Sequence, residues 1–133
     1  MKIAIIGTGA MGSVYAGVLA EAGHEIWAID SWADHIEQIK SNGLTLEGAS
    51  GNRTITNLSA TTDADDAAAC DLYVIATKAD GVGSAAQAVA RNMPEDSLIL
   101  TIQNGLGAGE RIAKFIDTKN VLLGVAEGFG ASM

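Results

Sequence analysis

Three glycines near the N-terminus have the types and spacing of a phosphate-binding turn. The pattern Gly-x-Gly-x-x-Gly fills residues 7–12, which read Gly7-Thr8-Gly9-Ala10-Met11-Gly12. The first glycine permits a tight turn, the second lets backbone approach a pyrophosphate, and the third lets a helix pack closely on a strand. The N–H groups at that helix N-terminus, together with its dipole, would then bind the phosphates.

A carboxylate follows the glycines at the distance where a ribose ligand belongs. Asp30 ends the apolar stretch that starts at Glu25, and it comes about 20 residues after the glycines. There it would accept hydrogen bonds from both adenosine ribose hydroxyls and repel a 2′-phosphate, so it favours NAD over NADP. The alternative role is an N-cap for a helix starting near Ser31. Trp32 either packs on that helix or lies against the adenine.

Two further polar residues follow two later apolar stretches. Lys78 comes after residues 72–76, and Asn104 comes after residues 98–102. A lysine there could bind a ribose hydroxyl or a substrate carboxylate, and an asparagine amide could donate to a carbonyl oxygen. Taken separately, Lys78 is better explained as a solvated loop lysine, and Asn104 is equally consistent with an ordinary turn residue. Their matching positions, in the same predicted crevice as the glycine turn, favour a shared site.

These candidate residues require a particular framework, and the hydrophobic pattern predicts it. Apolar strands alternate with helical stretches, which indicates an α/β protein with a mostly parallel, doubly wound Rossmann-type sheet. The period-two stretches at 43–48 and 53–58 predict a small antiparallel hairpin insert. The predicted strands cover residues 2–6, 25–29, 72–76, 98–102 and 121–125, and the predicted helices cover 10–22, 33–42, 82–92 and 107–116.

Composition limits the classes of partner. The chain has 133 residues, 48% of them hydrophobic, which suffices for one domain with a core. Its net charge of −8 disfavours nucleic acid and anionic membranes as partners. No apolar run has the length of a membrane span, and the single cysteine favours a cytoplasmic setting. His24 and His35 are isolated, so no metal site is expected.

The motifs together resemble the ketopantoate reductase (2-dehydropantoate 2-reductase) family over nearly the whole chain. The resemblance is carried by the glycine turn at 7–12, Ala76-Thr-Lys78, Gln103-Asn104-Gly-Leu-Gly107 and the stretch 120–124. It implies hydride transfer from NADPH to the ketone of a 2-keto acid such as ketopantoate. It also implies that residues 7–12 hold the pyrophosphate and that Lys78 lies near the nicotinamide ribose. Asn104 would contact both the nicotinamide and the substrate, and Gly130 would touch the cofactor through its backbone.

The resemblance further implies two domains, of which residues 1–133 would be the dinucleotide-binding one. The family's general-acid lysine lies in a C-terminal helical domain that this chain lacks, so we expect cofactor binding with little turnover. The uncovered face would favour a homodimer. Because Asp30 favours NAD while the family usually uses NADP, both cofactors stay open.

Two other functions fit parts of this pattern. One is a stand-alone dinucleotide-sensing module that regulates a partner without chemistry, which would have no need for Lys78 and Asn104. The other is a different dehydrogenase of the same fold, against which the loop at 104–107 argues.

Overall fold

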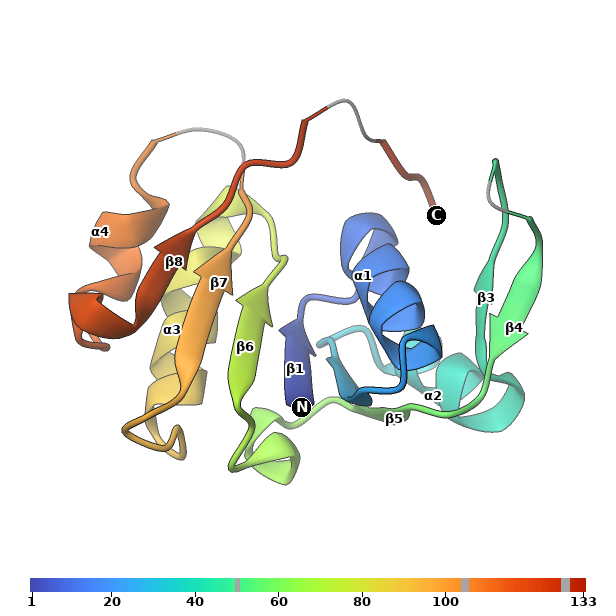
Figure 1. Ribbon diagram of the computed structural model, residues 1–133, viewed down its shortest axis with the longest axis horizontal. Helices are drawn as coiled ribbons and strands as arrows, with labels where there is room; N and C mark the ends of the chain where they lie inside the picture. Colours follow the sequence, from blue (N-terminus) through green and yellow to red (C-terminus); the bar gives the residue numbers. More distant parts are fainter. Residues whose placement is uncertain (50, 104–105, 128–129) are drawn as a thin grey trace.

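A single six-stranded parallel sheet forms the centre of the computed structural model (Figure 1), which describes residues 1–49, 51–103, 106–127 and 130–133. The order of the strands reverses beside the first strand, as in a doubly wound Rossmann-type fold, so the predicted fold class is confirmed. Across the sheet the strands are β5 (Ser59–Thr61), β2 (Glu25–Ile29), β1 (Lys2–Ile6), β6 (Leu72–Ile75), β7 (Leu98–Thr101) and β8 (Val121–Leu123).

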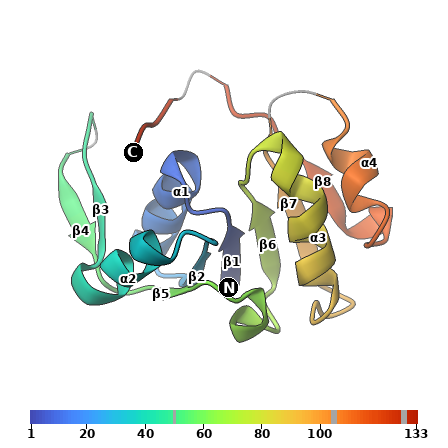
Figure 2. The same cartoon turned by 180° about the vertical axis from the view of Figure 1, so that it is seen from behind.

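The helices connect these strands over both faces of the sheet. Figures 1 and 2 show α1 and α3 on opposite faces. Short 3₁₀ turns lie at 64–67, 79–81 and 118–120. None of the helices in the described part of the chain is long and apolar enough to cross a membrane. The helices are α1 (Ala10–Glu21), α2 (Ala33–Asn42), α3 (Val82–Ala90) and α4 (Ala108–Ile112).

Alternate residues of the central strand build two separate cores. Ile3 and Ile5 pack in a cluster with residues of α1, α2 and the hairpin, whereas Ala4 and Ile6 pack with residues of α3 and α4. All four side chains are buried, as expected for a strand that is covered on both faces. This arrangement explains why the sequence of β1 is continuously apolar.

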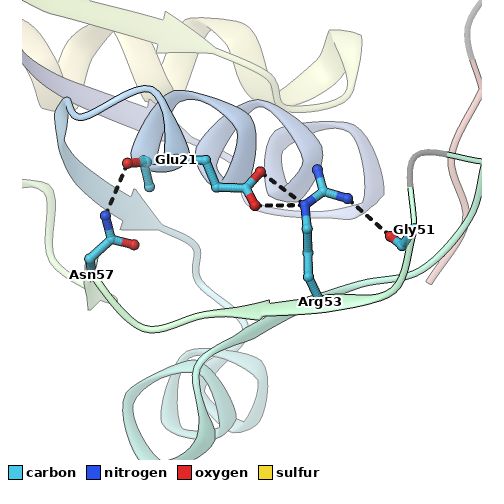
Figure 3. A network of polar contacts seen from close by, with 5 residues as sticks. Glu21, Gly51, Arg53 and Asn57 are labelled. Atoms are coloured by element: carbon cyan, nitrogen blue, oxygen red, sulfur yellow. Dashed lines mark hydrogen bonds and ion pairs between the residues drawn. The ribbon is translucent and has the colours of Figure 1, made fainter.

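The predicted hairpin is present, although both strands are shorter than expected. β3 (Leu44–Leu46) pairs antiparallel with β4 (Arg53–Ile55) and forms its own two-stranded sheet. Arg53 Nε lies 2.7 and 2.9 Å from the two carboxylate oxygens of Glu21 on α1, and Asn57 Nδ2 donates to Ala20 O at 3.0 Å (Figure 3). These contacts fix the hairpin against the C-terminal end of α1.

Three sequence expectations need correction. The strand β5 was not predicted, because Ser59-Ala-Thr61 carries no apolar run and pairs only with β2 at the edge of the sheet. Helix α4 ends at Ile112 rather than near residue 116, and β8 ends at Leu123 rather than residue 125. β8 forms the opposite edge of the sheet. Leu122 and Leu123 are exposed there, so burial of apolar side chains does not favour a longer strand.

The only cysteine lies in the core beneath the sheet. Cys70 is 1% exposed, its Sγ lies 3.2 Å from Ala67 O, and its backbone N–H donates to Tyr73 Oη at 3.1 Å. Ser97 Oγ donates to Cys70 O at 2.7 Å. Burial raises the pKa of the Cys70 thiol to about 11, and it also raises the pKa of Tyr73. The thiol therefore stays neutral and has a structural role.

The raised pKa of Cys70 predicts a loss of stability in alkali. The unfolded thiol releases its proton near pH 9 while the folded thiol retains it to about pH 11, so folding stability falls as pH rises through this window. The loss approaches roughly 2–3 kcal/mol at the upper end. Urea unfolding at pH 8 and pH 10.5 measures it. Cys70→Ala should show a shallower decline than wild type, and parallel declines would contradict the prediction.

Candidate nucleotide-binding site at the strand switch point

The glycine turn joins β1 to α1 at the point where the strand order reverses. Gly7 has a φ of +92°, and its N–H donates to Ile29 O at 2.7 Å at the end of β2. A Cβ at Gly7 would lie 2.8 Å from Thr77 N, in the segment that follows β6. Only glycine fits this position, because the backbone is left-handed and the space is filled.

The third glycine of the turn brings α1 onto the loop. A Cβ at Gly12 would lie 2.0 Å from Gly7 O and 3.4 Å from Ala76 Cβ. The close helix packing that was predicted for Gly12 is therefore confirmed. Its consequence is that the N-terminus of α1 lies directly against the ends of β1 and β6.

The second glycine faces open space. Gly9 is the N-cap of α1 with a φ of −65°, and a Cβ there would meet no other atom within 4 Å. Among the described residues no side chain caps this helix, and no acidic residue lies in its first turn. The first-turn N–H groups are therefore free of side-chain partners, as an anion-binding helix terminus requires.

Thr8 anchors the turn and leaves one polar atom without a partner. Thr8 is fully buried, and its carbonyl oxygen lies 2.8 Å from Ser13 Oγ and 2.8 Å from His35 Nε2. Its own hydroxyl makes no hydrogen bond with any described residue. A buried hydroxyl without a partner is unfavourable, and a bound polar ligand would satisfy it.

His35 is a contact of the site that sequence reasoning missed. The sequence marks it as an isolated histidine, and nothing in its spacing indicates a bond across 27 positions to Thr8. In the structure it also stacks on Trp32, with ring centroids 5.3 Å apart. Trp32 thus packs on its neighbouring helix, yet its side chain remains 54% exposed beside Asp30.

Asp30 lies just beyond β2, half-buried, with one carboxylate oxygen engaged locally. Asp30 Oδ1 accepts from Trp32 N at 2.9 Å. The alternative role as a helix N-cap is wrong, because α2 begins at Ala33 and Trp32 occupies the N-cap position. Asp30 instead closes a short turn. Its Oδ2 makes no hydrogen bond with the described residues and is free to accept one.

Lys78 lies in the segment between β6 and α3, next to the glycine turn. Its side chain is exposed and makes no hydrogen bond or ion pair with the described residues. Thr77, which contacts Gly7, carries a second buried hydroxyl without a described partner. Arg111 Nη1 donates to Ala79 O at 2.7 Å and so holds the far side of this segment to α4.

A glutamine joins the ends of β6 and β7. Gln103 Nε2 donates to Ile75 O at 2.7 Å and to Thr77 O at 2.9 Å, and its Oε1 accepts from the Thr101 hydroxyl. Gln103 belongs to the motif at 103–107 that carries the family resemblance, but no role was predicted for it. A glutamine after a strand gives no signal from which this bridge could be predicted.

The structure brings several of the predicted residues together. The glycine turn, Asp30 and Lys78 share the carboxyl edge of the sheet. Asn104 lies outside the described residues. Gly130 is exposed in the C-terminal segment, and a Cβ there would meet nothing within 4 Å. No group of three or more His, Cys, Asp or Glu gathers as a metal site in the described ranges.

The fold and the glycine turn place the chain in the Rossmann-type class of doubly wound α/β proteins, and comparisons with known proteins specify the family. Residues 3–133 match the family described as ketopantoate reductase PanE/ApbA. The chain therefore belongs to the ketopantoate reductase family. It is 31% identical over 124 residues to the 2-dehydropantoate 2-reductase of Halobacterium salinarum, covering 93% of this chain and 41% of that protein. The Lactococcus lactis enzyme of the same name is 30% identical, with 93% and 40% covered.

Solved structures agree with this assignment. A D-mandelate dehydrogenase with NADH and anilino(oxo)acetate has a TM-score of 0.85 and 32% identity, covering 94% of this chain and 40% of that one. A 2-dehydropantoate 2-reductase from Enterococcus faecalis, named as putative, has a TM-score of 0.83 and 31% identity, with 94% and 41% covered. This chain thus spans about two fifths of the length of the relatives it matches.

The glycine geometry predicts opposite outcomes for two alanine substitutions. Gly12→Ala forces a Cβ against Gly7 O and should lower the free energy of unfolding by about 3 kcal/mol or more. Gly9→Ala is the matched control in the same turn, because its Cβ would lie in open space at an ordinary φ. It should change the free energy of unfolding by about 1 kcal/mol or less. Urea unfolding followed by circular dichroism measures both. Equal losses would contradict the assignment of distinct roles.

Proposed function

We propose that this chain is the cofactor-binding part of an NAD(P)H-dependent reductase of 2-keto acids, with ketopantoate or a related compound as substrate. The observation that carries the proposal is the arrangement at the strand switch point. An uncapped helix N-terminus, an open Gly9 and the unpartnered hydroxyl of Thr8 meet there. Dinucleotides bind at this place in doubly wound sheets.

The proposed contacts follow the length of a dinucleotide from the adenosine ribose to the nicotinamide. Residues 7–12 would hold the pyrophosphate through backbone N–H groups, and Thr8 Oγ1 would gain a partner. Asp30 would bind the adenosine ribose, and Lys78 would lie near the nicotinamide ribose. Asn104 and, through its backbone, Gly130 complete the proposed contacts.

The reaction assigns separate tasks to this chain and to a second domain. Bound NADH or NADPH would supply the hydride that converts the substrate ketone to an alcohol. Asn104 would donate its amide N–H to the carbonyl oxygen and orient the ketone, and the Lys78 ammonium would attract the substrate carboxylate or the cofactor ribose. The proton for the developing alkoxide would come from the helical domain that the family resemblance implies beyond residues 1–133.

We further propose that NAD is the preferred cofactor. The free oxygen of Asp30 can accept a ribose hydroxyl, while its charge repels a 2′-phosphate. Ser31 and Trp32 follow it, so no basic side chain is adjacent in sequence to hold that phosphate. The relative D-mandelate dehydrogenase was solved with NADH. The comparisons give no support to the alternative of a dinucleotide sensor without chemistry.

Calorimetric titration of the chain with NADH and NADPH tests the cofactor proposal. Wild type should bind NADH more tightly than NADPH. Asp30→Asn should raise the Kd for NADH about tenfold or more, because a charged acceptor is lost. The asparagine retains an oxygen for Trp32 N, so the local turn is preserved. Gly9→Ala is the control, since it should weaken both nucleotides alike. Tighter binding of NADPH by wild type would show that Asp30 only closes a turn.

Fusion of residues 1–133 to the remainder of the Halobacterium salinarum relative tests the reaction. The fusion should oxidise NAD(P)H in the presence of ketopantoate or another 2-keto acid, followed at 340 nm. Asn104→Ala in this fusion should lower kcat/KM roughly 10²-fold, because one donor to the carbonyl oxygen is removed. The control is Asn42→Ala, at the exposed end of α2, which should leave kcat/KM unchanged. A fusion that binds cofactor but reduces no 2-keto acid would contradict the proposal.

A further inference from the structure

One carboxamide, that of Gln103, joins the end of β7 to the segment that carries Lys78, a proposed nicotinamide-end residue. The paired register of β6 and β7 ends at Ile75 and Thr101. Beyond this point the Gln103 side chain links the two segments, because its Nε2 donates to the carbonyls of both Ile75 and Thr77. Its side chain therefore continues the connection between the strands one step past the sheet.

The Thr101 hydroxyl fixes the orientation of this carboxamide. The hydroxyl of Thr101, which is 2% exposed, donates to Gln103 Oε1, so the Nε2 donors must face the two carbonyls. Both N–H groups of the amide are then used, and the oxygen has a partner. A fully satisfied, part-buried amide of this kind has one stable arrangement.

The carbonyl of Thr77 immediately precedes Lys78, and Gln103 itself immediately precedes Asn104. On the other side, Thr77 N lies against Gly7 of the glycine turn. We propose that Gln103 is a positioning residue, which fixes the Lys78 segment relative to the end of β7 for the nicotinamide end of the cofactor. The inference rests on the proposed function, in which Lys78 and Asn104 bind that end.

The chain contains a matched control for this bridge. Asn120 Nδ2 donates to Glu95 O at 2.7 Å and Ser97 O at 2.9 Å, near the start of β7, at the opposite end of the sheet from the glycine turn. It is likewise one amide that joins two backbone carbonyls. Asn120→Leu should therefore remove the same kind of interaction without touching the site.

The experiment compares two nucleotides that share the adenosine half. ADP lacks the nicotinamide ribose and ring, whereas NADH carries both. Gln103→Met keeps the side-chain length but removes the amide, and it should raise the Kd for NADH about tenfold, since small displacements of positioning groups have effects of this size or larger. The Kd for ADP should change less than about twofold. Asn120→Leu should leave the ratio of the two Kd values at its wild-type level.

Thr101 variants provide a second test that does not depend on Gln103→Met folding. Thr101→Val removes the hydroxyl that orients the amide, so it should raise the ratio of the Kd for NADH to the Kd for ADP. Thr101→Ser retains the hydroxyl and should keep this ratio at its wild-type level. Equal weakening of NADH and ADP, or no change in either, would overturn the positioning role. A wild-type chain that binds neither nucleotide would overturn the proposed function itself, and with it this role for Gln103.

Discussion

The close approach of two backbone segments, Gly7 after β1 and Thr77 after β6, is the constraint on which the rest of the site depends. It brings the strands on either side of the switch point within van der Waals contact at their carboxyl ends. Gly12 lets the N-terminus of α1 pack directly against Gly7 at the same place. Because these contacts involve backbone, they tolerate no side chain, and they hold the helix N-terminus, Thr8 and the Lys78 segment in a fixed relation.

The polar contacts around this point form a frame for the loops. His35 reaches Thr8 from α2, Arg111 reaches Ala79 from α4, and Gln103 links β6 to β7. Each bond ends on a backbone carbonyl at the carboxyl edge of the sheet. Rigid strands supply the positions while side chains from neighbouring elements restrict the loops, which is how sites on this class of sheet retain their geometry.

Sequence reasoning predicted the features that depend on local pattern. Continuous apolar runs marked β1 and β6, and the spacing of Gly7, Gly9 and Gly12 marked the turn. It missed β5, because this short edge strand has no apolar run and is defined by pairing with β2. It also missed the bridges of His35 and Gln103, since a hydrogen bond to a distant carbonyl leaves no periodic trace.

The exposed edge at β8 has a consequence for how the chain behaves in solution. On one side this strand has no neighbour among the described residues, and its Leu122 and Leu123 are 48% and 71% exposed. Open strand edges with apolar side chains promote pairing between chains, whereas a net charge of −8 keeps chains apart through mutual repulsion. Salt screens that repulsion and leaves the apolar attraction intact. Higher ionic strength therefore weakens the repulsion that opposes pairing at this edge.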